Sequence, residues 1–185
     1  FVFGQNGATN LCIDLTVFGR STGAQWSTDR AFAGTAGRAV NTGIGCGAGT
    51  ITSSSVSGGS GVYTAGATLD VSLANAPANT AALLMYSFDQ KDLAPGVPLP
   101  LDLSVLGTAP GCDLMLNPSE GFSIYLADGA GAATASFVIP AGIAQVGVGM
   151  QWGYFVPPSA TNPFGLEITN NRTIWIGPEV VVPNA

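Results

Sequence analysis

The sequence lacks histidine altogether, which removes the general base of Ser–His and Cys–His nucleophile pairs and the commonest side chain of zinc and copper sites. Charged residues are also scarce, at 9% of the chain against roughly 25% in an ordinary soluble domain. Five residues are cationic and the formal net charge is −6. This balance argues against a nucleic-acid partner and against an anionic membrane surface, because phosphate binding needs clustered Lys and Arg.

Long hydrophobic runs are missing as well. No uninterrupted apolar stretch reaches the ~18 residues of a membrane-spanning helix, so no membrane insertion is expected. The chain starts at Phe1 without a signal peptide, which predicts a processed, mature terminus. Helical periodicity is nearly absent, yet 46% of the 185 residues are apolar, and 26 glycines and 12 prolines supply many turns. The composition therefore favours one β-rich domain with a substantial core.

The clearest strand signal lies over 144–156, AQVGVGMQWGYFV, which has no charge and alternates with period two. Trp152 is expected in the core, and so is Trp175 in a later strand pattern. Residues 122–126 and 134–139 flank Asp128-Gly129-Ala130-Gly131, a hairpin signal, whereas three prolines predict an extended loop over 93–100. Further strands are predicted over 50–56, 67–73, 81–88, 102–105, 113–116, 166–168 and 173–176. The predicted fold is an all-β, antiparallel β-sandwich over 45–185, immunoglobulin-like or jelly-roll in layout.

The first 44 residues are expected to form an N-terminal strand and an irregular, Gly-rich extension. In the segment 11–18, LCIDLTVF, four aliphatic side chains alternate with Cys12, Asp14, Thr16 and Phe18. Such a segment can fold back on its own domain or add a strand to a neighbouring subunit. The candidate intersubunit residues are Phe1, Val2, Phe3, Leu11, Cys12, Ile13, Leu15 and Val17.

The chain has three cysteines, Cys12, Cys46 and Cys112. Scarce lysine, an acidic balance and abundant Ser, Thr and Gly are typical of a secreted protein, where two cysteines are expected to pair and one to be left over. The triplet Asn171-Arg172-Thr173 makes Asn171 a candidate N-glycosylation site. The alternative for this triplet is an ordinary turn before a strand.

Several motifs between residues 45 and 177 resemble a recurrent C-terminal module of large secreted proteins in planctomycete-type bacteria. They are Gly45-Cys46-Gly47-Ala48-Gly49, Ala74-Asn75-Ala76-Pro77 leading into Ala82-Leu83-Leu84, 97–103 (VPLPLDL), 107–112 (GTAPGC), Gln151-Trp152, 162–166 (NPFGL) and 174–177 (IWIG). The resemblance implies an extracellular β-sandwich and a Cys46–Cys112 disulfide. The module carries no assigned activity, and the resemblance does not extend to residues 1–44.

Chemical signatures are weak. Asp89 and Asp92 share one loop and are a candidate calcium pair, although an ordered ladder of acidic ligands is missing, so no cofactor is expected. The eleven acids could supply the two carboxylates of a glycoside hydrolase, but most fall at turns or on outward strand faces. The alternating glycines of 43–49 lack a following helix, which favours a turn over a dinucleotide loop.

The sequence is therefore interpreted as that of a non-enzymatic, extracellular structural protein. Its subunits would self-assemble into a filament or pilus-like polymer, joined by insertion of the N-terminal strand into the next subunit's sheet. Cys12 would bridge subunits and give a ladder of oligomers on a non-reducing gel. The alternative is an extracellular carbohydrate-binding or cell-surface adhesion module with Trp26 as its stacking residue.

Overall fold

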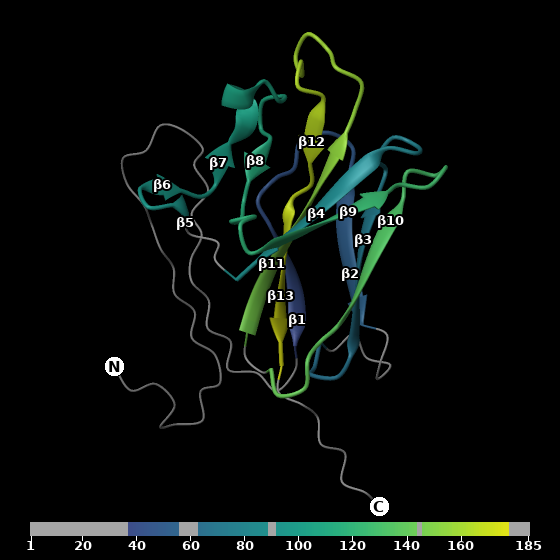
Figure 1. The fold of residues 1–185 in the computed structure, drawn as a ribbon, viewed down its shortest axis with the longest axis vertical. Helices are drawn as coiled ribbons and strands as arrows, with labels where there is room; N and C mark the ends of the chain where they lie inside the picture. Colours follow the sequence, from purple (N-terminus) through teal and green to yellow (C-terminus); the bar gives the residue numbers. More distant parts are fainter. Residues whose placement is uncertain (1–36, 56–62, 89–91, 144–145, 178–185) are drawn as a thin grey trace, which may run out of the picture. The chain divides into compact units, whose positions relative to one another are not determined.

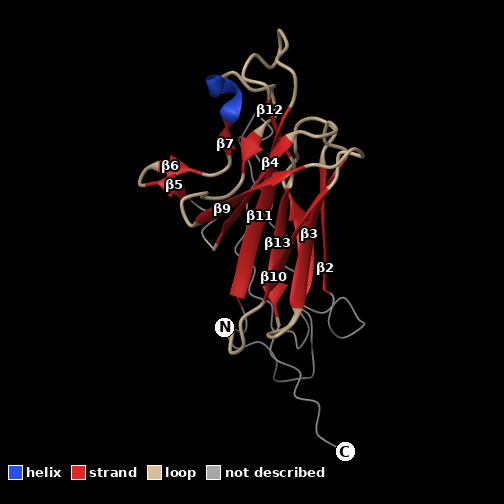
Figure 2. Cartoon of the chain, turned by 45° about the vertical axis from the view of Figure 1, so that its right-hand side comes forward, coloured by secondary structure: helices blue, strands red, loops and turns tan. Residues whose placement is uncertain are grey.

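The computed structural model describes residues 37–55, 63–88, 92–143 and 146–177 (Figure 1). These residues form antiparallel sheets, and their helical structure is a single short 3-10 turn, coloured blue in Figure 2. The prediction of an all-β, antiparallel sandwich is confirmed. The strand predicted over 11–18 lies outside the described residues.

The larger sheet has its strands in the order β1-β13-β11-β4-β9, and β12 pairs with the C-terminal end of β11. The bounds are β1 (Arg38–Thr42), β4 (Ala81–Ser87), β9 (Gly121–Leu126), β11 (Val146–Phe155), β12 (Leu166–Ile168) and β13 (Asn171–Ile176). All of these pairings are antiparallel. Because β1 belongs to this sheet, part of the segment assigned to the N-terminal extension is a strand of the sandwich.

A smaller sheet has the order β10-β3-β2, made of β2 (Thr50–Ser55), β3 (Thr68–Ala74) and β10 (Ala133–Val138). The main core lies between the two sheets. It contains the inward side chains of β3 and those of the long strand β11, including Leu69, Val71, Leu73, Val148, Met150, Trp152 and Tyr154. The face of β11 predicted from its alternation is therefore the core face, and Trp152 is completely buried.

The opposite face of β11 is buried too, which period two alone does not show. A second cluster covers it, made of Cys46, Met85, Leu103, Cys112, Leu114, Leu116 and Ile168. Gln151 on this face is fully buried; its Oε1 accepts from the Met115 amide at 3.0 Å, and its Nε2 donates to the Thr169 carbonyl at 2.8 Å. Because these hydrogen bonds satisfy its amide group, the polar Gln151 side chain can be buried in a core strand.

An outer layer of short elements supplies that second cluster. It consists of β5 (Asp92–Ala94), β6 (Val97–Pro98), β7 (Leu101–Asp102), the 3-10 helix η1 (Leu103–Leu106) and β8 (Asp113–Leu114), with β5 paired to β6 and β7 to β8. The extended loop predicted over 93–100 is therefore wrong in part. A proline is tolerated in so short a ribbon because its missing N–H can face away from the partner strand. The strand predicted over 102–105 is also wrong, because η1 occupies most of it.

The hairpin predicted around Asp128 is wrong. Strand β9 pairs with β4 in the larger sheet, whereas β10 pairs with β3 in the smaller one, so the loop between them crosses from one sheet to the other. Asp128 Oδ1 accepts from the amides of Ala130 and Ala132, at 2.8 and 2.9 Å. The carboxylate organises a connection between sheets, and the same turn chemistry also occurs in hairpins.

Replacing Asp128 by alanine should destabilise the domain at neutral pH more than at acid pH. Hydrogen bonds from the Ala132 and Ala130 amides lower the pKa of Asp128 in the folded state. A lowered folded-state pKa contributes stability above the unfolded pKa, and that contribution is lost as the pH falls through the folded pKa. Urea denaturation at pH 7 and below pH 3 measures this difference. Asp128→Asn is the matched control because it keeps an acceptor oxygen, and equal losses for Asp128→Ala at both pH values would contradict the assignment.

The alternating glycines of 43–49 pass close over β11 and β12. A Cβ at Gly47 would overlap the Glu167 carboxylate, and one at Gly49 would overlap the Tyr154 ring. Gly47 also has a φ of +84°, a conformation that favours glycine. The glycine motif therefore allows close backbone approach, which agrees with the turn predicted there.

Candidate interaction surface on the edge strand

Strand β9 ends the larger sheet, and no other strand of the described residues pairs with its outer edge. Its side chains alternate, and the outward ones are Phe122, Ile124 and Leu126, exposed by 60%, 72% and 70%. An outward row on an antiparallel sheet is ordinarily polar, and edge strands usually carry charges that block pairing. Residues 121–126 contain no charge, so β9 combines an open edge with an apolar outer row.

The inner face of β9 holds the strand firmly against the core. The ring of Tyr125 meets that of Trp152 edge-on, with centroids 5.2 Å apart. At the start of the strand, Gly121 lies so close to the Tyr86 ring that a Cβ there would overlap it. The exposed row therefore belongs to a fixed strand, and its exposure does not arise from a loosely packed segment.

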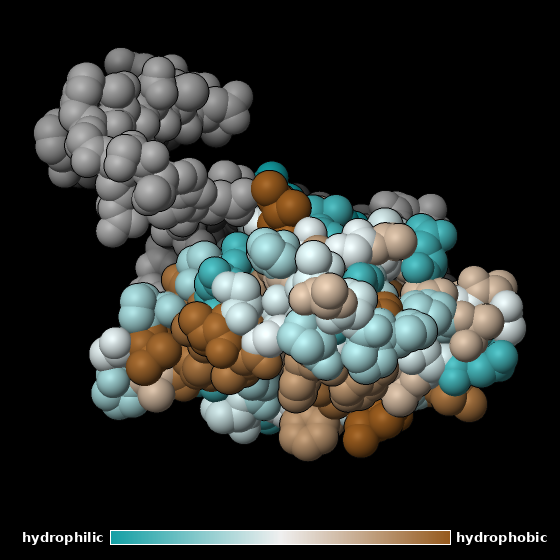
Figure 3. All heavy atoms as spheres, turned by 90° about the horizontal axis from the view of Figure 1, so that it is seen from above, coloured by the Kyte–Doolittle hydropathy of each residue, from teal (hydrophilic) through white to brown (hydrophobic). Residues whose placement is uncertain are grey.

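The exposed row of β9 lies beside apolar residues of β4, of which Ala81 is exposed, Leu83 is half-buried and Met85 is buried. The register pairs each exposed residue of β9 with an apolar residue of β4: Leu126 with Ala81, Ile124 with Leu83, and Phe122 with Met85. Beside them runs a groove of 410 Å³ lined by Leu83, Met85, Leu93, Asn117, Pro118, Ser119 and Phe122. In the space-filling view, brown hydrophobic residues reach the surface in several places (Figure 3). An exposed apolar row beside a shallow groove commonly marks a docking site.

The polar residues of the groove wall are already occupied by their own loop. Asn117 Nδ2 donates to the Asp92 carbonyl at 3.2 Å, and Asn117 Oδ1 accepts from the Ser119 amide at 3.0 Å. These bonds fix the wall, and no lining residue is charged. The groove is therefore suited to an apolar side chain, since a charged group would lose its hydration there without gaining an ionic partner.

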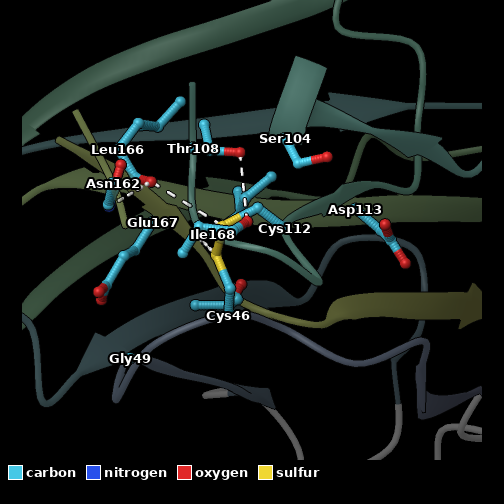
Figure 4. The surroundings of a disulfide bond; sticks show 12 residues. Cys46, Gly49, Ser104, Thr108, Cys112, Asp113, Asn162, Leu166, Glu167 and Ile168 are labelled. Carbon is cyan, nitrogen blue, oxygen red and sulfur yellow. Dashed lines mark hydrogen bonds between the residues drawn. A yellow bond between two sulfur atoms is a disulfide. The ribbon is translucent and has the colours of Figure 1, made fainter. Parts of the chain in front are cut away.

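The disulfide joins Cys46 to Cys112, as the resemblance implied (Figure 4). The Cys46 amide donates to the Ile168 carbonyl at 2.9 Å, and the Ile168 amide donates to Cys46 Sγ at 3.3 Å. Both cysteines are buried. The bond therefore fastens the glycine segment and the outer layer to each other across β12.

A buried tyrosine–carboxylate contact lies near the disulfide. Tyr154 Oη donates to Glu167 Oε2 at 2.8 Å and accepts from the Gly49 amide at 2.7 Å. Burial raises the pKa of Tyr154 above its usual range, and the Glu167 carboxylate adds to the rise. The phenol thus stays protonated and serves as a fixed donor. This contact was missed in the sequence, because the two residues lie on different strands and only their register brings them together.

Two acids of the outer layer, Asp102 and Asp113, face each other across the β7–β8 ribbon. Burial and the Asp102 carboxylate raise the pKa of Asp113, whereas hydrogen bonds from the Ser104 backbone and side chain lower the pKa of Asp102. Neither acid lines the groove. Across 37–55, 63–88, 92–143 and 146–177, no three Asp, Glu or Cys side chains come close enough together to hold a metal ion.

The candidate glycosylation residue Asn171 is buried, with 1% of its surface exposed. Its Nδ2 donates to Thr42 Oγ1 at 2.9 Å and to Thr173 Oγ1 at 3.1 Å. Its amide is thus engaged inside the folded domain and is not presented to a glycosyltransferase. Asn171 is also the first residue of β13, so its position favours the alternative that the triplet is an ordinary strand start.

The remaining predicted residues divide between the described and undescribed parts of the chain. Trp175 is only half-buried and packs its ring over Gly147, so its assignment to the core is wrong. Asp92 is exposed on β5, and its partner Asp89 lies outside the described residues. Also outside them are Trp26 and all the intersubunit candidates, Phe1, Val2, Phe3, Leu11, Cys12, Ile13, Leu15 and Val17.

The fold and this surface define an antiparallel β-sandwich protein with an internal disulfide and an unpaired, apolar edge strand. Comparison with known families, curated proteins and solved structures gives no match to any of them. Within the part of the chain that the structure describes, no helix is long and apolar enough to cross a bilayer.

Proposed function

We propose that this chain is an extracellular structural subunit that self-assembles by strand addition. Residues 11–18 of one subunit lie along the free edge of β9 in the next. Main-chain hydrogen bonds provide the affinity, and the row formed by Leu11, Ile13, Leu15 and Val17 lies beside the row of Phe122, Ile124 and Leu126. Each contact leaves another edge open at the end of the assembly, so the polymer grows head to tail.

The observation that carries this proposal is the outer row of β9. Strand β9 carries no charge and exposes three large apolar side chains to solvent. Natural edge strands usually avoid this combination, because it invites pairing with another strand. The segment 11–18 has the matching alternation, with its acidic residue, Asp14, on the opposite face from the aliphatic row. The two strands can therefore pair without placing a charge in the apolar row.

The linker between the segment 11–18 and β1 is long enough for strand addition. Nineteen residues, 19–37, separate the segment 11–18 from β1. Fully extended, they span about 65 Å, whereas the four strand spacings from β1 to β9 come to about 19 Å. A linker of this length would let the segment pair with the β9 of a neighbour or with the β9 of its own chain. The experiment must separate these two arrangements.

The extracellular location rests on the disulfide. Buried disulfides that fasten structural elements are typical of oxidising compartments. An acidic chain with few lysines agrees with that setting, as does a surface rich in Ser and Thr, such as the outward residues of β2.

The disulfide limits the number of subunits that Cys12 can link. Cys46 and Cys112 bind each other, so Cys12 is the one remaining thiol among the chain's three cysteines. One thiol per chain can link two chains and no more, so Cys12 by itself cannot produce the ladder of covalent oligomers on a non-reducing gel. A Cys12–Cys12 bridge would give dimers only, and the head-to-tail contact does not require it.

The test is to delete residues 1–18 and, separately, to replace Ile124 by lysine. Both changes should turn filaments of the full chain into monomers, as seen by electron microscopy and size-exclusion chromatography. Ile124 is 72% exposed, so the lysine should block pairing with little effect on folding. Thr134→Lys, on the exposed face of edge strand β10, is the matched control and should leave filaments intact.

A peptide with the sequence of 11–18, carrying serine at position 12, should bind the deleted protein but not the Ile124→Lys variant of it. A peptide of the same composition with its apolar residues consecutive should bind neither. Filaments that persist without residues 1–18 would refute the proposal. A full chain that stays monomeric at all concentrations, while its deleted form binds the peptide, would show pairing within one chain and would refute self-assembly.

A further inference from the structure

Two carboxylates stand directly opposite each other in the outer layer. Asp102 of β7 pairs with Asp113 of β8, and beside them the Leu103 amide donates to the Cys112 carbonyl at 2.9 Å. Hydrogen-bonded and non-hydrogen-bonded pairs alternate along an antiparallel ribbon, so the two acids form a non-hydrogen-bonded pair, in which side chains come closest. Their Cβ atoms are therefore expected about 4.5–5.5 Å apart. We call Asp102 and Asp113 the acid pair.

The two acids have different surroundings. Asp102 is exposed, and its Oδ1 accepts from the Ser104 amide at 2.8 Å, which caps η1. Asp113 is half-buried, and no described residue donates a hydrogen bond to its carboxylate. Burial and the charge of Asp102 raise the pKa of Asp113, whereas the Ser104 backbone and side chain lower the pKa of Asp102. Asp113 is therefore the acid that holds the proton when the pair binds only one.

Among the described residues, Asp102 is the one whose charge acts on the Asp113 carboxyl. Glu167 on β12 is bonded to Tyr154 of β11, and Figure 4 shows it on the opposite side of the disulfide from Asp113. Asp92 on β5 is exposed, and its charge is not among those that act on Asp113. The cations of the described residues lie on β1 and β13, which pair with neither β7 nor β8; they are Arg38 and Arg172.

The backbone at the acid pair attaches the outer layer to the larger sheet. The Asp113 carbonyl accepts from Gln151 Nε2 at 2.9 Å, so β8 is held on β11. Strand β7 leads directly into η1, whose first residue, Leu103, is buried in the second cluster and bonds through its amide to the Cys112 carbonyl. Repulsion within the acid pair therefore acts on the attachment of β7 and η1, because β8 has a second anchor.

We propose that the acid pair makes the β7–β8 ribbon sensitive to pH: with one proton on Asp113 the ribbon is closed, and with both acids ionised β7 and η1 open from β8 more often. A protonated Asp113 can donate to the Asp102 carboxylate, whereas two carboxylates placed directly opposite repel each other. The inference concerns the fold of a single chain and does not rest on the proposed self-assembly.

The direction of the effect follows from the raised pKa of Asp113 in the folded state. Such a group stabilises the folded state fully below its unfolded pKa, and this contribution is lost as the pH rises through the folded pKa. Asp102 and Asp128, whose pKa values are lowered, act in the opposite sense and at lower pH. The ribbon should therefore open as the pH rises above the ordinary pKa of aspartate, about 3.9.

The test is amide hydrogen exchange in the full chain, followed by NMR between about pH 4 and pH 7. The intrinsic exchange rate at each pH is divided by the measured rate, so that the resulting protection factor reports opening alone. Protection of the Leu103 amide should fall about two- to five-fold as the pH rises, the size expected of one cross-strand pair. The Thr169 amide, which donates to the Trp152 carbonyl at 2.8 Å, is the internal reference and should keep its protection.

Asp113→Asn and Asp102→Asn each remove one charge of the acid pair, and the second keeps the oxygen that caps η1. Both variants should make Leu103 protection independent of pH, whereas Asp92→Asn, at an exposed acid of β5, should leave the dependence in place. Carboxyl-carbon NMR of the parent chain needs no variant and should show Asp113 titrating at higher pH than Asp102. Constant protection in the parent chain, a dependence that persists in Asp113→Asn, or the reverse order of titration would each overturn the proposal.

Discussion

Trp152→Ala is expected to lower the free energy of unfolding by about 3–5 kcal/mol, the range found when a large buried aromatic side chain is truncated. Trp152 is fully buried in the main core, where its ring meets Tyr125 edge-on at 5.2 Å. Residues of the smaller sheet pack on one side of this ring, and Tyr125 of β9 contacts the ring from the same sheet as Trp152. Truncation therefore leaves a cavity that β11, buried on both faces, cannot collapse to fill.

Urea denaturation followed by circular dichroism measures the effect, and Trp152→Phe is the matched control. Trp152 Nε1 has no hydrogen-bond partner among the described residues, so phenylalanine removes a buried polar group while keeping an aromatic ring in place. Its cost should be clearly smaller than that of alanine. A loss below about 1 kcal/mol for Trp152→Ala, the level of an ordinary surface change, would contradict the burial of this residue.

Removing the disulfide by Cys46→Ala with Cys112→Ala is expected to cost about 4 kcal/mol in the chain-entropy model. The two cysteines are 66 residues apart, so the bond closes a long loop and restricts the unfolded chain strongly. Cys46 and Cys112 also belong to the second cluster, which covers the outer face of β11. Alanine is chosen over serine because a buried hydroxyl would add a desolvation cost of its own.

The same double variant should lose more stability than Cys12→Ala, which removes the thiol outside the disulfide. Thermal and urea denaturation of the three proteins, with and without reductant, give the comparison. Reductant should destabilise the parent chain toward the level of the double variant and leave the double variant unchanged. A parent chain as stable as the double variant under oxidising conditions would mean that the bond contributes nothing to the fold.

The two halves of the proposed strand contact differ in how far the sequence reveals them. The donor pattern is local: four aliphatic residues between 11 and 17 alternate, and period two is visible without a structure. The acceptor is not local. Residues 122–126 also alternate, but both faces of that pattern carry apolar or aromatic residues. Only the pairing of β9 with β4, and the contact of Tyr125 with Trp152, shows that Phe122 and Ile124 face outward.

The predictions that the structure contradicts fail for the same reason. The turn at Asp128 has the chemistry of a hairpin, yet its flanking strands pair in different sheets. Trp175 belongs to a strand, yet its side chain packs over Gly147 and does not enter the core between the sheets.

The amino-acid sequence alone determined that the part of the chain described by the structure is all β, where most of its strands lie, and which face of β11 enters the core. Side-chain alternation, turn residues and missing helical periodicity are local properties, so a sequence reveals them. Tertiary structure decided the strand order, the cover on the second face of β11, and the exposure of β9. These depend on pairing between segments far apart in the chain. Such pairing is chosen by the burial of the whole core and not by any one stretch of residues.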